Sequence, residues 1–292
     1  MGIALMENEL RRLQLTQLEI LKVVNRFCLE NAIPYYLCGG TLLGAVRHRG
    51  FIPWDDDLDI CMPRDAYDRF ISAWRENGSE GYILQNKEDT PSFTQSFTKV
   101  RKEHTTFLQE ESERGRYHTG IFIDIFPIDR APAGNVRKLF FYGQCMLYQL
   151  FTREFIPPKA GKATRLGSAL LLGLVRGEKR KRAREGLLKS LKRYDNDTTF
   201  QTVLFDTVIR MKQFYPADFF DNSVMLEFEG GAYPVMARWD EYLTTVYGDY
   251  MTLPPESERT WKHHPIILDF EHDYGELMAL RDSKPFSEPG AT

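Results

Sequence analysis

Four aspartates lie within five residues of this chain, at positions 55, 56, 57 and 59. In an extended chain, residues two apart point to the same side at a spacing of about 7 Å, so Asp57 and Asp59 can share one cation. Clustered carboxylates raise each other's pKa and resist joint ionisation, and a divalent cation removes this conflict. Mg²⁺ prefers oxygen ligands and is usually held by one or two carboxylates together with substrate phosphates. We therefore predict a Mg²⁺ site at Asp57 and Asp59, with Mn²⁺ as the alternative ion. Asp55 adds a further ligand to this site if the strand starts early.

The competing interpretation of these acids is a solvated acidic turn or a row of carboxylates that stabilises helix dipoles. Residues 57–60 alternate acidic and apolar side chains with a period of two, as a strand buried on one face does. This alternation favours a strand, and with it a shared site for the acids.

Asp124 is the third carboxylate of the predicted site. It lies between Ile123 and Ile125 in a strand-like segment, where an unpaired ionised acid would be costly to bury. A metal shared with the other acids would stabilise it, and there it could accept a proton from an attacking hydroxyl. The alternative is a salt bridge to Lys99 or Arg101 on a neighbouring strand, and Lys99 is also a candidate to hold a phosphate as a point charge.

A glycine turn ahead of the acids has the features of a phosphate site. Gly39 and Gly40 allow a phosphate to approach the backbone, and Thr41 adds a hydroxyl. The helix predicted from Leu42 presents free N–H groups and a partial positive charge at its N-terminus. A plain strand-to-helix turn explains the glycines equally well, and their place beside the acids favours a combined phosphate and metal site.

Arg47, His48 and Trp54 lie between the glycine turn and the acids. The two basic residues are predicted to contact phosphate or acceptor, although a cation at the end of a helix also stabilises the negative end of its dipole. Trp54 is a candidate to stack on a base or on an organic cation, with a place in the core as the alternative.

The periodicity of apolar residues predicts the elements that position these groups. Helices are expected over about 8–31, from Leu42 to His48 and over 65–77. Strands are expected over 35–38, 57–62, 82–84, 97–100, 105–108 and 121–126, the last ended by Pro127. From about Asn135 the chain is predicted to be mainly helical.

The composition is that of an ordinary globular protein, with 42% hydrophobic and 27% charged residues among 292. It excludes a disordered, collagen-like or coiled-coil chain, and the length allows one large domain or two. The four cysteines are far apart and form no CxxC pair, which argues against a disulfide scaffold and a structural zinc. The N-terminus lacks the pattern of a signal peptide, and no apolar run approaches the roughly 20 residues of a membrane span, so we expect a cytoplasmic protein.

A strongly basic segment spans residues 159–193, with twelve Lys or Arg against two Glu and a net charge of +10. Because the whole chain carries −3, the remainder carries −13. Beside the apolar decapeptide 166–175, this segment is a candidate to meet an anionic membrane surface or an acidic polymer. A solvated helix face beside a buried helix is the equal alternative. Nucleic acid is not expected as a partner, because aromatic residues are not interleaved and the whole chain is acidic.

Together these motifs resemble the LicD family, bacterial phosphocholine transferases related to fukutin within the nucleotidyltransferase-fold superfamily. The resemblance is carried by CGGTLLGAVRHRGFIPWDDDLDI at residues 38–60 and by GIFIDIFP at residues 120–127. Near the end, YGDYM at residues 247–251 and the basic residues Arg259 and His263 resemble the closing motifs of the family.

The resemblance implies an α/β (α+β) fold, a nucleotidyltransferase-like mixed sheet flanked by helices with a mainly helical C-terminal part. We expect a catalytic core over 1–134, which includes the N-terminal helix, and a helical, basic insertion over 135–225 without recognisable family sequence. A C-terminal segment over 226–292 is expected to complete the active site. In this scheme the three predicted acids hold the metal, the glycine turn holds phosphate, and Arg259 and His263 contact substrate.

The implied activity is Mg²⁺-dependent transfer of phosphocholine from CDP-choline to a hydroxyl of a cell-envelope glycan, such as teichoic acid or lipopolysaccharide, with release of CMP. Because such acceptors are often lipid-linked, the resemblance favours a peripheral position on the inner face of the cytoplasmic membrane. The alternatives are transfer of ribitol phosphate or glycerol phosphate from another CDP-alcohol, nucleotidyl transfer to a small molecule, and a non-catalytic glycan-binding protein.

Overall fold

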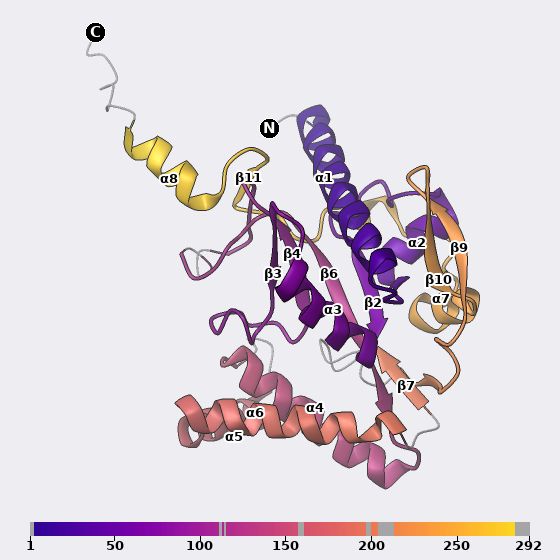
Figure 1. Cartoon of the computed structure of the whole chain (residues 1–292), viewed down its shortest axis with the longest axis vertical. Helices are drawn as coiled ribbons and strands as arrows, with labels where there is room; N and C mark the ends of the chain where they lie inside the picture. Colours follow the sequence, from indigo (N-terminus) through magenta and orange to yellow (C-terminus); the bar gives the residue numbers. More distant parts are fainter. Residues whose placement is uncertain are drawn as a thin grey trace.

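The computed structural model describes residues 3–110, 113, 115–156, 161–196, 200–203 and 213–283. Its centre is a mixed sheet in which neighbouring strands follow the order β1-β2-β6-β4-β3 (Figure 1). These strands are β1 (Tyr36–Leu37), β2 (Asp59–Pro63), β6 (Phe122–Ala131), β4 (Thr98–Lys102) and β3 (Tyr82–Gln85). β2 and β6 run parallel, whereas the other pairs along this order are antiparallel. Helices and mixed strands in one unit confirm the predicted α+β class.

The strand β6 continues beyond its predicted end. Pro127 is predicted to terminate it, but the strand extends to Ala131. The proline lies between residues 122–125, which pair with β4, and residues 128–131, which pair with β7 (Phe200–Val203). Its missing N–H therefore interrupts neither of these antiparallel ladders, and the predicted end of the strand was wrong for that reason.

Two helices pack on the sheet and form the main core with it. α1 (Ile3–Glu30) and α3 (Arg64–Asn77) both contact β6. The ring of Phe27 in α1 packs against Phe70 and Trp74 in α3, at centroid distances of 5.7 and 4.7 Å. Each helix buries the apolar side that recurs at three- and four-residue steps, so both confirm the periodicity of the sequence.

The helix after the glycine pair starts earlier than predicted. α2 (Gly39–His48) includes Gly39 and Gly40 in its first turn, whereas the sequence predicts a start at Leu42. Gly39 has φ +56°, a left-handed conformation that glycine adopts without a Cβ penalty. The chain therefore passes from β1 into α2 through Cys38 alone, and the N-terminal N–H groups of the helix belong to the glycine turn.

The C-terminal part begins with a hairpin that the sequence did not indicate. β9 (Ser223–Phe228) and β10 (Gly231–Met236) pair antiparallel, and β10 contacts β1. At the turn, Glu229 accepts two hydrogen bonds from Arg11 of α1 and one from the N–H of Phe51. The apolar residues of β9 do not alternate with polar ones, so the strand lacks the pattern from which it could be predicted.

After the hairpin the chain crosses back to the core. The elements along this path are α7 (Trp239–Tyr247), the 3-10 helix η4 (Glu256–Glu258), β11 (Ile267–Asp269) and α8 (Tyr274–Ser283). α7 packs against α2, and β11 pairs antiparallel with β5 (Thr106–Leu108). The stretch between η4 and β11, residues 259–266, is called the C-terminal strap below.

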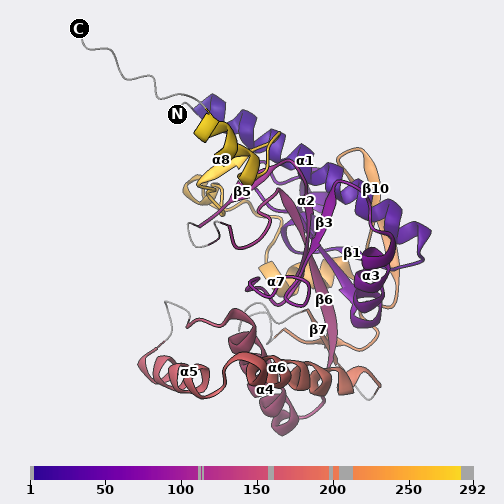
Figure 2. The same ribbon diagram turned by 60° about the vertical axis from the view of Figure 1, so that its left-hand side comes forward.

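The remaining helices form a layer at one end of the sheet, the helical annex (Figures 1 and 2). It consists of α4 (Asn135–Arg153), α5 (Lys162–Leu174) and α6 (Gly177–Leu191). The 3-10 helix η2 (Lys192–Asn196) leads out of it, and β7 and β8 (Tyr215–Pro216) return the chain to the sheet. Residues 159 and 160 of the basic segment lie outside the described residues. Within the described part of the chain, no helix combines the length and the apolar character that a membrane span requires.

Candidate active site

Three adjacent strands place three predicted site residues in one row. Asp59 is the first residue of β2, and its register partner on the parallel strand β6 is Asp124. The register partner of Asp124 on β4 is Lys99. Side chains in register on neighbouring strands point to the same side of the sheet, so Asp59, Asp124 and Lys99 lie side by side.

Asp124 forms the salt bridge that the sequence offered as the alternative to a metal. The Lys99 Nζ donates to Asp124 Oδ1 at 2.6 Å, and the ammonium also lies 3.3 Å from the centroid of the Phe122 ring. Burial lowers the pKa of Lys99, although the nearby Asp124 counteracts this effect. The cation and the carboxylate are therefore held as a pair at the centre of the sheet, and Arg101 instead binds Gln85 and a backbone carbonyl.

The acidic loop before β2 is clamped by α1. The Gln14 Nε2 donates to the backbone oxygen of Asp55, and the Gln17 Nε2 donates to that of Asp56, each at 2.9 Å. Asp57 lies in this loop rather than in the strand, because β2 begins only at Asp59. The predicted strand start at residue 57 was therefore two residues early, and β2 does not extend the row to Asp55.

Asp56 connects the acidic loop to the C-terminal strap. Its buried carboxylate accepts hydrogen bonds from the N–H of His263 at 2.8 Å and of Lys262 at 3.4 Å. The His263 Nδ1 lies 3.2 Å from Asp56 Oδ1 and 3.9 Å from Asp57 Oδ2. The hydrogen bond to Asp56 raises the pKa of His263, which favours the protonated ring between the two acids.

Lys262 extends over the remaining acids. Its Nζ lies 3.5 Å from Asp55 Oδ1, and it interacts electrostatically with Asp57 and Asp59 as well. Burial, and after it the charge of the neighbouring Asp57, raise the pKa of Asp55 to about 7 against the opposing effect of Lys262. Burial also raises the pKa of Asp57. Even with the strap in place, burial among like charges thus disfavours the ionised forms of these two acids.

The glycine turn leaves room for these carboxylates. A Cβ on Gly40 would lie 2.5 Å from Asp55 Oδ2, and one on Gly39 would lie 2.9 Å from Asp59 Oδ2. The Thr41 Oγ1 accepts a hydrogen bond from the N–H of Asp59 at 2.8 Å, so this hydroxyl fixes the start of β2. The first turn of α2 and the acids therefore form one site, as their order in the sequence suggested.

The predicted basic and aromatic residues gather beside Asp55. The Arg47 Nε donates to the His48 Nε2 at 3.0 Å, and the His48 ring meets the Trp54 ring edge-on at 6.2 Å. The Arg259 guanidinium lies over the Trp54 ring at 5.4 Å, and Arg47 interacts electrostatically with both Arg259 and Asp55. The structure thus gathers basic side chains from α2 and from the strap, together with the Trp54 ring, at the edge of the acidic cluster.

The donor set fits a hard divalent cation. Carboxylate oxygens dominate it, and two of the acids have raised pKa values because they are buried beside other carboxylates. The charge of Asp124 raises the pKa of Asp57, so the acids of the loop and of the strands belong to one electrostatic cluster. Among the described residues, Asp56, Asp57 and His263 also offer ligand atoms that lie within 4.8 Å of one another.

Sequence reasoning missed two residues of this site. Asp56 was passed over although it belongs to the acidic run, because its role depends on a backbone segment 206 and 207 residues away. Lys262 stands beside the predicted His263 in a basic stretch, and that stretch was its only signal.

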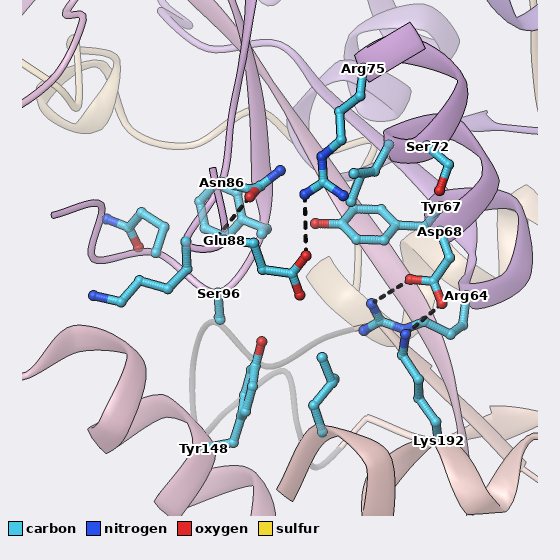
Figure 3. A pocket seen from close by; sticks show the side chains of 15 residues that line it. Arg64, Tyr67, Asp68, Ser72, Arg75, Asn86, Glu88, Ser96, Tyr148 and Lys192 are labelled. Carbon is cyan, nitrogen blue, oxygen red and sulfur yellow. Dashed lines mark hydrogen bonds and ion pairs between the residues drawn. The ribbon is translucent and has the colours of Figure 1, made fainter. Parts of the chain in front are cut away.

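A pocket of about 220 Å³ lies apart from this site, between α3, the β3–β4 connection and the annex (Figure 3). None of the predicted site residues lines it. Asp68 of α3 pairs with both Arg64 and Lys192, and Arg75 pairs with Glu88. The Asp68–Lys192 pair joins η2 to α3, and the other two pairs lie on the core side, so together they give the pocket a structural explanation.

Known proteins resemble the chain both at the site and far beyond it. The model of the LicD/FKTN/FKRP nucleotidyltransferase domain matches residues 32–159. The lipopolysaccharide cholinephosphotransferase LicD of Haemophilus influenzae is 33% identical over 268 residues, which cover 87% of this chain and 96% of that protein. An uncharacterised protein of Rickettsia typhi is 51% identical over 70 residues, which cover 24% of this chain and 23% of that protein. Because the Haemophilus protein is 33% identical across 87% of this chain, the chain belongs to the LicD family.

Proposed function

We propose that the protein transfers phosphocholine from CDP-choline to a hydroxyl of a cell-envelope glycan and releases CMP. The observation that carries the proposal is the cluster of acids from β2, β6 and the preceding loop, set against the glycine turn of α2. The likeness to a lipopolysaccharide cholinephosphotransferase supports phosphocholine as the group transferred and a lipopolysaccharide-type glycan as the acceptor.

Asp55, Asp57, Asp59 and Asp124 are the residues that would hold Mg²⁺, or Mn²⁺ in its place. Such an ion supplies positive charge to the donor pyrophosphate and to CMP as it leaves. The N–H groups in the first turn of α2 would bind phosphate oxygens, because a helix N-terminus combines free donors with partial positive charge. Substitution of Gly40 would fill the space in which the phosphate approaches the acids.

Asp124 is the proposed proton acceptor. The bond between phosphorus and the CMP oxygen breaks, the acceptor oxygen forms a bond to that phosphorus, and the hydroxyl proton passes to the Asp124 carboxylate. The Lys99 ion pair fixes the orientation of this carboxylate in the row of strands. Positioning and electrostatic stabilisation suffice for such a transfer, and no covalent enzyme intermediate is required.

Arg47, Arg259, His263 and Trp54 are proposed to bind the donor and the acceptor. Arg47 interacts electrostatically with both Asp55 and Arg259, so the two guanidinium groups are placed to receive the phosphates and the leaving CMP. The half-buried Trp54 ring, over which the Arg259 guanidinium lies, is the proposed stacking partner of the cytosine or of the quaternary ammonium of choline. His263 is held against Asp56, so the strap carries it to the edge of the proposed reaction centre.

The test is a transfer assay with CDP-choline, MgCl₂ and a lipopolysaccharide oligosaccharide, in which CMP release and product mass are measured. Asp57→Asn should abolish transfer without a change in the thermal unfolding midpoint, whereas Asp221→Asn, the same change at an exposed aspartate, should leave turnover intact. Full turnover by Asp57→Asn would contradict the proposed site.

The same assay distinguishes the other members of this reaction class. CDP-ribitol or CDP-glycerol as the preferred donor would change the group transferred but not the site. A product that retains the nucleotide would instead indicate nucleotidyl transfer. Absence of Mg²⁺-dependent nucleotide binding in calorimetry would indicate a non-catalytic glycan-binding protein.

We further propose that the protein works in the cytoplasm at the inner face of the cytoplasmic membrane. The donor is a soluble nucleotide, whereas an envelope glycan with a lipid anchor is fixed in the bilayer. Transfer between the two is most efficient where the enzyme is held at the surface that carries the acceptor.

A further inference from the structure

Helix α5 presents a row of leucines that the described structure does not cover. Leu166, Leu170 and Leu174 recur every four residues and so share one face of the helix. They are 75%, 61% and 69% exposed, and no residue of α5 is buried. A continuous apolar row of this kind on a soluble surface is typical of an interaction site.

The neighbouring helix of the same layer adds further exposed apolar groups. In the first two turns of α4, Val136, Leu139 and Phe140 are each about 70% exposed. α4 contacts α5, and Figure 2 shows both helices in the annex at the end of the molecule away from the two termini. Two helices of the annex therefore expose apolar side chains.

The segment that contains this apolar row is strongly basic. Residues 159–193 carry a net charge of +10, and Lys179, Lys181 and Arg182 of α6 are exposed. Two copies of this chain would bring two such charges together, so self-association through this surface is disfavoured. A nucleic acid would pair its phosphates with the cations but would leave the leucines exposed to water. An anionic lipid surface satisfies both, because its phosphates attract the cations and its acyl boundary accepts the leucines.

We propose that the annex docks on an anionic lipid bilayer, with the leucine row of α5 in the headgroup boundary and the α6 cations on the lipid phosphates. This docking supplies the contact for the membrane position proposed above.

The docked protein would hold its acids at a distance from the bilayer. Asp124 lies near the start of β6, and Ala131 at the other end of that strand leads into α4. Seven residues of extended chain span roughly 23 Å, and Figure 1 shows β6 running from the sheet toward the annex. If the proposed transfer holds, the acceptor is an extended, lipid-linked glycan whose reactive hydroxyl lies on a sugar remote from its anchor.

Vesicle co-sedimentation without nucleotide or glycan tests the docking surface by itself. The wild type should pellet with phosphatidylcholine vesicles that contain phosphatidylglycerol, and less so at high salt or with pure phosphatidylcholine. The triple variant Leu166→Ser, Leu170→Ser and Leu174→Ser should bind at least about tenfold more weakly. Leu29→Ser, which changes a leucine 73% exposed at the end of α1, is the matched control and should bind like the wild type.

Three results would overturn the proposal. These are equal binding of the triple variant, absence of binding to anionic vesicles, and sedimentation equilibrium showing a dimer that the triple variant loses. A second measurement separates the surface from the catalytic function. The triple variant should release CMP with a soluble glycan at the wild-type rate but lose turnover on a vesicle-anchored glycan. Failure of the wild type with both acceptors would reject the proposed transfer and leave the vesicle result standing.

Discussion

Loss of the charge on Lys262 should make the substrate-free protein bind Mg²⁺ more tightly. The Nζ lies 3.5 Å from Asp55 Oδ1 and also interacts with Asp57 and Asp59. The lysine therefore partly neutralises the acids that would hold the ion, and the incoming cation must displace or repel it. Lys262→Gln removes this competitor but keeps a side chain of similar length.

The structure sets the expected magnitude. Unit charges 3.5 Å apart interact by roughly 1 kcal/mol at the dielectric constant of water and by about four times as much at an effective constant of 20. Because 65% of the Lys262 side chain is exposed, solvent screens the pair and the lower value applies. Lys262→Gln should therefore lower the dissociation constant for Mg²⁺ by roughly fivefold.

Titration calorimetry with MgCl₂ at low ionic strength measures this constant without nucleotide. Lys262→Arg keeps the charge and should bind Mg²⁺ like the wild type. Lys189→Gln removes an exposed charge on α6, remote from the acids, and should also match the wild type. The reasoning fails if Lys262→Gln leaves the affinity unchanged or weakens it, or if Lys189→Gln gives the same gain.

Three further substitutions probe the site and its supports. Gly40→Ala should abolish transfer, because its Cβ would lie 2.5 Å from a carboxylate oxygen of the site, and the transfer assay checks this. Asp129→Ala should cost about 3–5 kcal/mol of unfolding free energy in denaturant titrations, since it leaves the buried Arg64 without its bidentate partner. Glu229→Gln should cost about 0.5–1 kcal/mol at neutral pH, discounted for solvent exposure. The hydrogen bond from Arg11 lowers the pKa of Glu229, so its contribution is complete above the ordinary value of 4.5 and is lost as the pH falls through the lowered value. The gap between the melting temperatures of wild type and variant should therefore close in acid.

The parts of the fold that the sequence predicts well are local. The helices α1 and α3 follow from periodicity, because each buries one side against the same sheet. The alternation of acidic and apolar residues around Asp59 indicated a strand, and β2 forms there. Asp124 was selected because a buried acid needs a partner, and the structure provides Lys99 beside it.

The parts that the sequence did not predict depend on distant segments. Whether Pro127 ends a strand is decided by where β4 and β7 pair, which no local pattern records. The hairpin of β9 and β10 lacks alternation, and its position is fixed by contacts of Glu229 with α1 and with the loop at Phe51. Asp56 and Lys262 came together only through the fold.

The bond between Asp56 and the strap has a consequence for biosynthesis. The strands β1, β2, β3, β4 and β6 can pair as soon as residue 131 has left the ribosome. The two backbone N–H groups that donate to Asp56 belong to Lys262 and His263, which follow Asp56 by 206 and 207 residues. For most of translation, a nascent chain thus contains the clustered aspartates without the C-terminal strap that contacts them. Fragments that stop within the annex would contain every acid of the proposed site but would lack Arg259 and His263 of the strap, so we expect them to be inactive.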